Sequence, residues 1–339
     1  ATGATAFGEL DLAGAKTVTL NATGKTTFVD SITTSATLGT LTITGAGAVD
    51  LSALDVGFTT VDASTATGGL TAELGTNDDT VLTGSTGNDT ITADTTNVLA
   101  TGDKLAVDAG DGTDTLVIAA TADIDTAADG ARYTNFETIS SVDSVDMSLV
   151  AGVTNLTITG GTSESYTQMT ATQLANVTFA ADNTTSTIFS LAVATGTADA
   201  ATINLASTTA TTNIDVIGAS LDNIETVNVN ATTGTNATVS NFGFLANMSD
   251  AVTALNITGS ADVEFNQVAN TLDVVAVAID ASGLTGTGHF VLDDAGNVGL
   301  IAGSTVTGSA NDDTIELSEI SGTKSATYDG GAGNDNFTG

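Results

Sequence analysis

Cysteine, proline and tryptophan are absent from this 339-residue chain, and lysine and arginine are nearly so. Without cysteine there can be neither a disulfide framework nor a thiolate zinc site. Aromatic residues make up only 4% of the chain, so the core has to be built mainly from Val, Ile, Leu and Ala. Threonine alternating with these residues is typical of β-strands, because β-branched side chains fit a pleated surface.

The chain has five cations against 40 acids, which gives a formal net charge of −35. The cations are Lys16, Lys25, Lys104, Arg132 and Lys324. Their scarcity argues against nucleic acid as a partner, because phosphate binding depends on Lys and Arg. Two explanations of the charge stay open: a solvated acidic surface that keeps the protein soluble, or carboxylates that metal cations neutralise.

Long apolar runs are also missing. The most apolar stretch, TLDVVAVAIDASGL, is interrupted by Asp273 and Asp280. No uncharged apolar run approaches the ~18 residues that a membrane-spanning helix needs. We therefore expect no membrane insertion.

A short strand phrase recurs along the chain at intervals of about 20–25 residues. Its copies include TVTLNATG at 17–24, TLTITGAG at 40–47, NLTITGG at 155–161, TVNVNATTG at 226–234 and ALNITGS at 254–260. One short strand per such interval, with Gly and Asn at the bends, is typical of stacked rungs, each rung being one circuit of the chain. The sequence therefore predicts an all-β, elongated β-solenoid-like stack, with tandem β-sandwiches as the alternative.

The sequence also contains a longer duplication, each copy of which spans several of these rungs. Five anchors of the region 18–116 return in the same order in the region 227–337; LTITG at 41–45, for example, returns as LNITG at 255–259. We therefore divide the chain into two β-rich repeats, 1–116 and 117–339, each ending in paired Gly-Asp turns. We expect the duplicated regions to form the same run of strands and turns, with LTITG and LNITG in the same sheet.

The last turn carries the most specific motif. From Gly330, the sequence GGAGNDNFT matches the nine-residue pattern G-G-x-G-x-D-x-(apolar)-x. Glycines allow a tight turn whose carbonyls can point inward, and Asp335 adds a carboxylate, while Phe337 anchors the turn to a strand. Hard oxygen ligands in a flexible ring suit Ca²⁺.

Related turns place Asp89, Asp114 and Asp313 at the same position of the motif, and a weaker copy at 75–82 offers Asp78 and Asp79. Asp89 precedes Asp114 by 25 residues, and Asp313 precedes Asp335 by 22, which is about one rung. In a solenoid the paired turns would lie side by side and share an oxygen cage. The candidate calcium ligands are Asp78, Asp79, Asn88, Asp89, Asp94, Asp108, Asp111, Asp114, Asp312, Asp313, Asp329, Asn334 and Asp335. Turns of the Asx type without metal stay open as the alternative.

Two further acids precede strand phrases in a similar way. Glu137 in FETIS and Glu225 in IETVNV are either additional calcium ligands or solvated acids at a strand edge.

With these turns the sequence resembles the calcium-binding repeats-in-toxin (RTX) proteins of Gram-negative bacteria, and more closely the RTX-type surface-layer proteins. The resemblance implies type I secretion, a calcium-bound β-rich fold, an extracellular location at the cell surface, and self-association into a homo-oligomeric lattice or filament. It also implies lipopolysaccharide as a partner, through a segment outside this chain. Isolated turn pairs, instead of long tandem arrays, favour this class. A segment of a large secreted RTX adhesin and the non-catalytic tail of a secreted RTX enzyme are the alternatives.

No catalytic motif is present. The single histidine, His289, excludes an H-E-x-x-H zinc site, and no G-x-S-x-G nucleophile elbow occurs. Lyases with a solenoid fold that cut acidic sugars use Lys or Arg, but we expect Arg132, near the Gly-Asp turns in sequence, to pair with a neighbouring acid. We therefore expect no enzymatic activity.

Overall fold

The structure of the protein is a computed structural model. It describes residues 5–8, 10–12, 14–28, 32–33, 39–51, 54, 57–74, 79–93, 103–183, 186–193, 195–206, 214–232, 240–244, 251–267, 275–293, 300–316 and 326–338.

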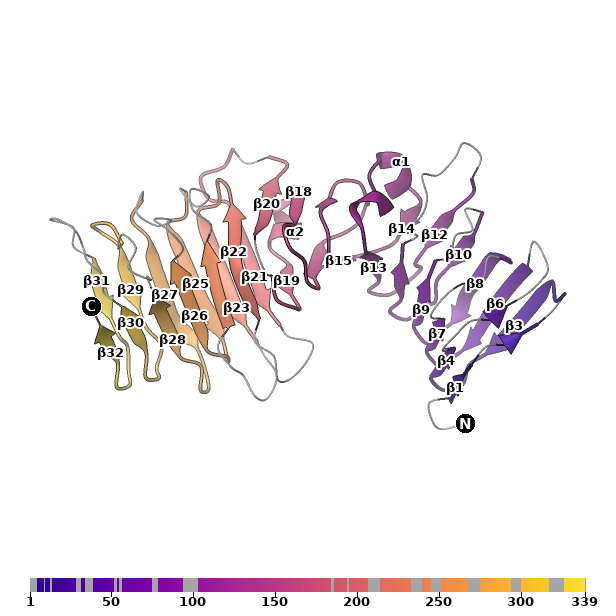
Figure 1. Ribbon diagram of the computed structural model, residues 1–339, viewed down its shortest axis with the longest axis horizontal. Coiled ribbons are helices and arrows are strands. Elements are labelled where there is room, and N and C mark those ends of the chain that lie inside the picture. The colour runs from indigo at the N-terminus through magenta and orange to yellow at the C-terminus, as the bar shows by residue number, and fades with distance from the viewer. Residues whose placement is uncertain are drawn as a thin grey trace. The chain divides into compact units, whose positions relative to one another are not determined.

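The chain is a parallel β-solenoid, as the recurring strand phrase predicts. Each long strand pairs in parallel with a strand of the rung before and one of the rung after; β23 (Thr226–Ala231), for example, lies between β21 (Ala200–Leu205) and β25 (Ala254–Gly259). Tandem β-sandwiches would consist of antiparallel strands, so that alternative is excluded. Figure 1 shows the strands stacked side by side within each part of the chain.

Contacts divide the chain into two compact units. Unit 1 comprises Ala1–Ser141 and Ser148–Thr154, and unit 2 comprises Val142–Met147 and Asn155–Gly339. This division by contacts is separate from the duplication of the sequence, whose boundary lies between 116 and 117.

Unit 1 has two main faces. The first face contains β1 (Thr5–Phe7), β4 (Thr26–Phe28), β7 (Val49–Leu51), β9 (Leu70–Glu73), β11 (Thr90–Thr92), β13 (Thr115–Ile118) and β15 (Thr138–Ser141). The second contains β3 (Thr17–Asn21), β6 (Gly39–Gly45), β8 (Phe58–Ala66), β10 (Val81–Thr83), β12 (Ala106–Asp108) and β14 (Tyr133–Thr134). The short strands β2 (Leu10–Asp11) and β5 (Ile32–Thr33) pair with each other, and a 3-10 turn (Thr121–Asp123) and α1 (Ala127–Gly130) precede β14.

Unit 2 is built in the same way. One face contains β17 (Asn155–Ile158), β19 (Val177–Phe179), β21, β23, β25, β27 (Ala278–Leu284), β29 (Thr305–Thr307) and β31 (Thr327–Asp329). The other contains β16 (Val145–Asp146), β18 (Ser165–Met169), β20 (Thr187–Leu191), β22 (Asp215–Leu221), β24 (Ser240–Phe244), β26 (Val263–Gln267), β28 (Phe290–Asp293), β30 (Thr314–Glu316) and β32 (Asn336–Thr338). Helix α2 (Ala171–Leu174) follows β18.

Aliphatic side chains stacked in register build the core of unit 2. Along β23 burial alternates, and Val227, Val229 and Ala231 face inward. Val229 pairs with Ile203 of the preceding rung and with Ile257 of the following rung. Burying one such side chain contributes roughly 1.5–3 kcal/mol. A continuous aliphatic stack therefore explains how a chain with so few aromatic residues forms a core.

Polar side chains form rows on the outer face of the same strands. The side-chain amide of Asn256 donates to Oδ1 of Asn228 at 2.9 Å, and that of Asn230 donates to Oδ1 of Asn204 at 3.2 Å. Neighbouring strands are ~4.8 Å apart, so equivalent polar side chains come within hydrogen-bonding distance. The alternation of Thr or Asn with aliphatic residues in the strand phrase thus supplies both faces of the sheet.

The duplicated segments keep their order but not their sheet. LTITG lies in β6, in the six-stranded sheet, whereas LNITG lies in β25, in the fifteen-stranded sheet, so the expectation of a shared sheet is wrong. The two strands are 19 positions apart in the strand order (25 − 6), as are β8 and β27 (27 − 8). Because successive strands alternate between faces, an odd separation places duplicated strands on opposite faces.

Candidate functional site at the glycine-aspartate turns

The two Gly-Asp turns of unit 1 lie on adjacent rungs, as the spacing of Asp89 and Asp114 predicts. Strands β11 and β13, which follow the turns, pair in register, with Ile91 opposite Leu116. The backbone N–H of Asp89 donates to Oδ1 of Asp114 at 2.7 Å. The carboxylate of the later turn therefore caps a backbone donor of the earlier turn.

This contact is one step of a repeated pattern, the acid ladder of unit 1, formed by Asp89, Asp114 and Glu137. The backbone N–H of Leu70 donates to Oδ1 of Asp89 at 2.6 Å, and that of Asp114 donates to Oε2 of Glu137 at 2.8 Å. The three donors occupy equivalent positions at the start of β9, β11 and β13. Each acid thus satisfies a backbone donor of the rung before its own.

Asp89 also holds its own turn together. Its side chain is only 1% exposed. Oδ2 accepts the backbone N–H of Ser85 at 2.6 Å, and Oδ1 accepts the Ser85 hydroxyl at 2.6 Å. Gly84 is required beside it, because a methyl group there would overlap the carbonyl oxygen of Ala109 and Oδ2 of Asp89.

Neighbouring polar residues link the same rungs. Oδ1 of Asn88 accepts the backbone N–H of Thr113 at 3.1 Å. Oδ1 of Asp108 accepts the backbone N–H of Gly110 at 3.1 Å and the side-chain amide of Asn135 at 2.7 Å. These contacts make the Asn-Asp dipeptide of the turn a two-way link: Asn88 accepts from the next rung, while the N–H of Asp89 donates to it.

Unit 2 repeats the arrangement at its last two turns. The backbone N–H of Phe290 donates to Oδ1 of Asp313 at 2.7 Å, and that of Asp313 donates to Oδ1 of Asp335 at 3.1 Å. The backbone N–H and the hydroxyl of Ser309 donate to Asp313 at 2.5 and 2.8 Å. The predicted pairing of the two turns is therefore present in both units.

The remaining predicted residues of these turns have matching roles. Oδ1 of Asp312 accepts the backbone N–H of Asn334 at 2.8 Å, as Asn88 does in unit 1. Oδ1 of Asp329 accepts the backbone N–H of Gly331 at 3.0 Å, as Asp108 does for Gly110. Identical contacts in two copies of the motif indicate that the motif encodes this turn geometry.

Burial makes two of the ladder carboxylates harder to ionise. Burial raises the pKa of Asp89, although its hydrogen bonds with Ser85 and Leu70 act in the opposite direction. Burial also raises the pKa of Asp114, to about 6, and the nearby charges of Asp89, Glu137 and Asp111 add to the increase. Oδ2 of Asp114 is buried without a hydrogen-bond partner. A charged Asp114 is therefore incompletely compensated by the protein.

The side-chain oxygen atoms around Asp114 supply only part of the ligands that a calcium ion needs. Among the described residues, no group of three or more acidic or histidine side chains is arranged to hold a metal. An ion beside Oδ2 of Asp114 would therefore depend on backbone carbonyls, which the glycine-rich turn can supply. By contrast, the Asp89 and Asp313 carboxylates already accept hydrogen bonds from their own turns.

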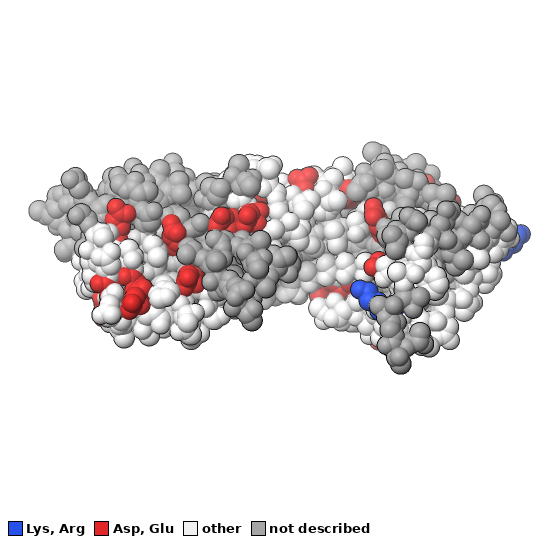
Figure 2. Space-filling view, turned by 60° about the horizontal axis from the view of Figure 1, so that its bottom comes forward, with Lys and Arg blue, Asp and Glu red and all other residues white. Residues whose placement is uncertain are grey.

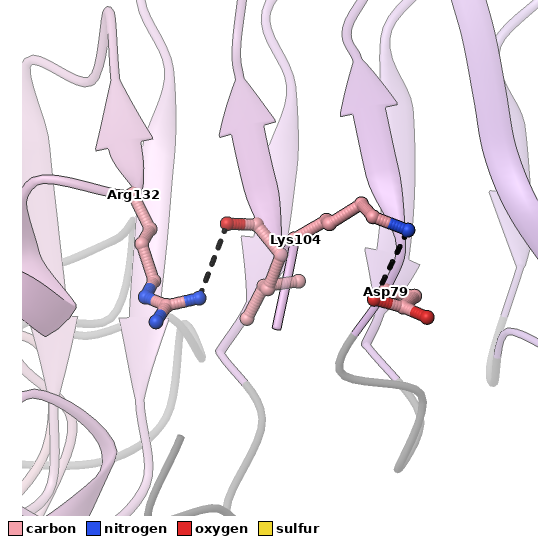
Figure 3. Close-up of polar contacts among 4 residues, drawn as sticks. Asp79, Lys104 and Arg132 are labelled. Atoms are coloured by element: carbon pink, nitrogen blue, oxygen red, sulfur yellow. Dashed lines mark hydrogen bonds and ion pairs between the residues drawn. The ribbon is translucent and has the colours of Figure 1, made fainter. Parts of the chain in front are cut away.

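The other predicted ligands are placed differently. Asp111 is exposed on the turn of Asp114. Asp79 lies away from the paired turns, with Oδ1 3.9 Å from Nζ of Lys104, in an exposed ion pair (Figure 3). Asp78 and Asp94 lie outside the described residues.

Two glutamates whose role the sequence left undecided, and one aspartate that it did not single out, take part in contacts of this kind in the two units. Glu137 belongs to the acid ladder of unit 1, so it is not merely a solvated acid at a strand edge. Glu225 acts in the same way in unit 2, where Oε2 accepts the backbone N–H of Asp199 at 2.8 Å. The signal available in the sequence is an acid followed by Thr and an aliphatic residue, which ETI and ETV share with DTI and DTL. Asp199, whose backbone N–H is the donor in this contact, is followed by two alanines and lacks that signal.

Among the charged side chains on the described surface in Figure 2, acidic ones cover much more area than basic ones. No protein-family model matches the sequence, and the search of curated proteins finds no match either. None of the helices among the described residues has the length and apolar character needed to span a bilayer.

Proposed function

We propose that this chain is a calcium-dependent structural protein that assembles into a lattice on the surface of a Gram-negative bacterium. The observation that carries the calcium part is Asp114, whose buried Oδ2 has no hydrogen-bond partner and lies near the charges of Asp89, Glu137 and Asp111. The lattice and the cell surface follow from the RTX resemblance, and the parallel solenoid is compatible with a structural, non-catalytic role.

Calcium would supply a divalent charge beside carboxylates that few cations are present to neutralise. The chain carries 40 acids and five cations. Backbone carbonyls of the Gly110–Gly112 turn and the Asp114 carboxylate are the groups that would hold the ion. With a dissociation constant of ~10⁻⁴ M in ~1 mM calcium, one such site stabilises the fold by about 1.4 kcal/mol. Several sites would therefore contribute a sizeable part of the roughly 5–15 kcal/mol that stabilises a domain.

The test is a calcium titration of the full chain at constant ionic strength, followed by circular dichroism and sedimentation velocity. We expect EDTA to loosen the fold and disperse assemblies, and calcium, but not sodium, to restore both. Unchanged spectra and sedimentation after verified removal of all calcium would falsify the proposal.

A pair of variants locates the effect. Asp114→Asn should weaken the calcium response, because it removes the carboxylate charge at the proposed site. Asp62→Asn is the matched control: it makes the same charge change in β8, where Oδ1 of Asp62 accepts hydrogen bonds from the backbone N–H and the hydroxyl of Ser64. Equal calcium responses in the two variants would remove Asp114 from the site.

A further inference from the structure

An open groove on the second face of unit 1 contains an arginine that the Gly-Asp turns do not use. The groove has a volume of about 390 Å³ and lies over β10, β12 and the start of β14. Val81, Ala106 and Arg132 contribute to one side, and Thr83, Asp108 and Thr134 to the other. The groove therefore combines an apolar floor, one cation, one acid and two hydroxyls.

The strand register explains why the surface is hollow there. Val81 of β10 pairs with Ala106 of β12, and Ala106 lies beside Arg132 because the next residues, Val107 and Tyr133, are paired. Ala106 is exposed, and its small side chain stands between two larger ones. The alanine thus leaves room for a ligand against the sheet.

Arg132 is available for an anionic ligand. Its Nη1 donates to the carbonyl oxygen of Leu105 at 3.5 Å, a long hydrogen bond, and among the described residues it forms no ion pair. The expectation that Arg132 pairs with a neighbouring acid is therefore wrong within this part of the chain. Figure 3 shows that the acid Asp79 pairs with Lys104 on the other side of β12 from Arg132. A guanidinium presents a planar fork of donors that matches a carboxylate.

The opposite side of the groove selects against simple anions. The Asp108 carboxylate repels a bare anion but can accept hydrogen bonds from hydroxyl groups. The Thr134 hydroxyl donates to the carbonyl oxygen of Val107 at 3.3 Å, so its oxygen keeps lone pairs for a ligand hydroxyl. Val81, 40% exposed, offers an apolar surface to C–H groups. A ligand that satisfies both sides carries one carboxylate and several hydroxyls on a partly apolar ring.

We propose that this groove binds a carboxylated sugar unit, such as a uronic acid residue of a polysaccharide. Arg132 binds the carboxylate, Asp108 and the two threonines bind ring hydroxyls, and Val81 and Ala106 contact the ring. The proposal goes beyond the calcium-dependent structural role and does not depend on it.

The test is a calorimetric and NMR titration of the full chain, in calcium, with a galacturonic acid trisaccharide. We expect a dissociation constant on the order of 1 mM, and much weaker binding of a neutral galactose trisaccharide or of acetate. Arg132→Gln should weaken binding of the acidic trisaccharide about tenfold or more. Lys25→Gln, the matched control, removes the same charge at an exposed position outside the groove lining and should leave binding unchanged.

A second variant tests the groove itself. Ala106→Val fills the hollow with a side chain suited to a strand, so it should abolish binding while the circular dichroism spectrum stays the same. No binding of the acidic trisaccharide, equal binding of the neutral one, or binding unaffected by both groove variants would overturn the proposal. So would reduced self-association of Arg132→Gln without saccharide binding, because the groove would then bind carboxylates of a second copy.

Discussion

Replacing Asp89 by Asn separates the two roles that its carboxylate could have. The native side chain accepts three hydrogen bonds, from the Leu70 N–H, the Ser85 N–H and the Ser85 hydroxyl. Asn keeps the shape and one acceptor oxygen, so Leu70 and the hydroxyl can remain bonded. Its amide nitrogen, however, replaces the oxygen that accepts the Ser85 N–H and puts two donors face to face.

The cost follows from the burial of this contact. Losing a hydrogen bond to a charged acceptor and leaving a buried donor unsatisfied costs about 1.5–3 kcal/mol. Asp89→Ala would also leave the Leu70 N–H without an acceptor, for a total of about 2–6 kcal/mol. These values are large beside a total stability of roughly 5–15 kcal/mol.

Urea unfolding followed by circular dichroism, in EDTA and in calcium, measures both variants. Because the hydrogen bonds involve no metal, we expect Asp89→Asn to lower the free energy of unfolding by a similar amount in both conditions. Asp111→Asn, at an exposed position of the next turn, is the control and should have little effect in EDTA. Loss of stability in calcium alone would refute the reasoning, because Asp89 would then act as a metal ligand and not as a cap.

Three further results are expected. In EDTA, the free energy of unfolding should rise as the pH falls from about 7 towards 4. The pKa of Asp114 is about 6 in the folded state and ~3.9 when unfolded, so the folded state binds more protons in this range. The opposite slope in pH-dependent urea unfolding, or the same slope in Asp114→Asn, would contradict this. Gly84→Ala should prevent native stacking, whereas Gly286→Ala, with φ +67° but nothing within 4 Å, should cost only about 1 kcal/mol; thermal melts of both variants check the contrast. Phe189→Ala should lower the free energy of unfolding by about 3–5 kcal/mol in urea, because this 1% exposed ring packs on Tyr166 and Phe179 at centroid distances of 5.9 and 6.2 Å. A decrease below about 1 kcal/mol would show that the surrounding side chains collapse into the space of the missing ring.

The strand phrase predicts the solenoid well because the alternation that it encodes acts within a single short strand. Aliphatic residues alternate with Thr or Asn in one strand per rung, and this alternation fixes which side chains enter the core and which form the outer rows. The side-by-side placement of Asp89 and Asp114 follows from the same reasoning, since a spacing of 25 residues is close to one rung.

The hydrogen-bond partners within the turns were harder to predict, because they depend on atoms from two rungs. A Gly-Asp motif is compatible both with carboxylates that surround a metal and with carboxylates that accept backbone N–H groups. Only the register of β11 on β13 decides that Asp114 accepts from Asp89. The sheet that each duplicated strand occupies depends on the number of half-turns between the copies, which a short motif does not encode.

The acid ladders have a consequence for how this chain can change in length. Partners in consecutive rungs are separated by as few as 19 residues, for Leu70 and Asp89, and by as many as 26, for Asp199 and Glu225. The same carboxylate-to-backbone contact therefore tolerates seven extra residues per circuit, provided that the chain returns to the same point of the stack. Segments can be lengthened, shortened or exchanged between the anchored strands, while a deletion that removes an anchoring acid breaks a link to the preceding circuit. A scaffold of this kind can acquire new binding loops one circuit at a time without rebuilding its interior.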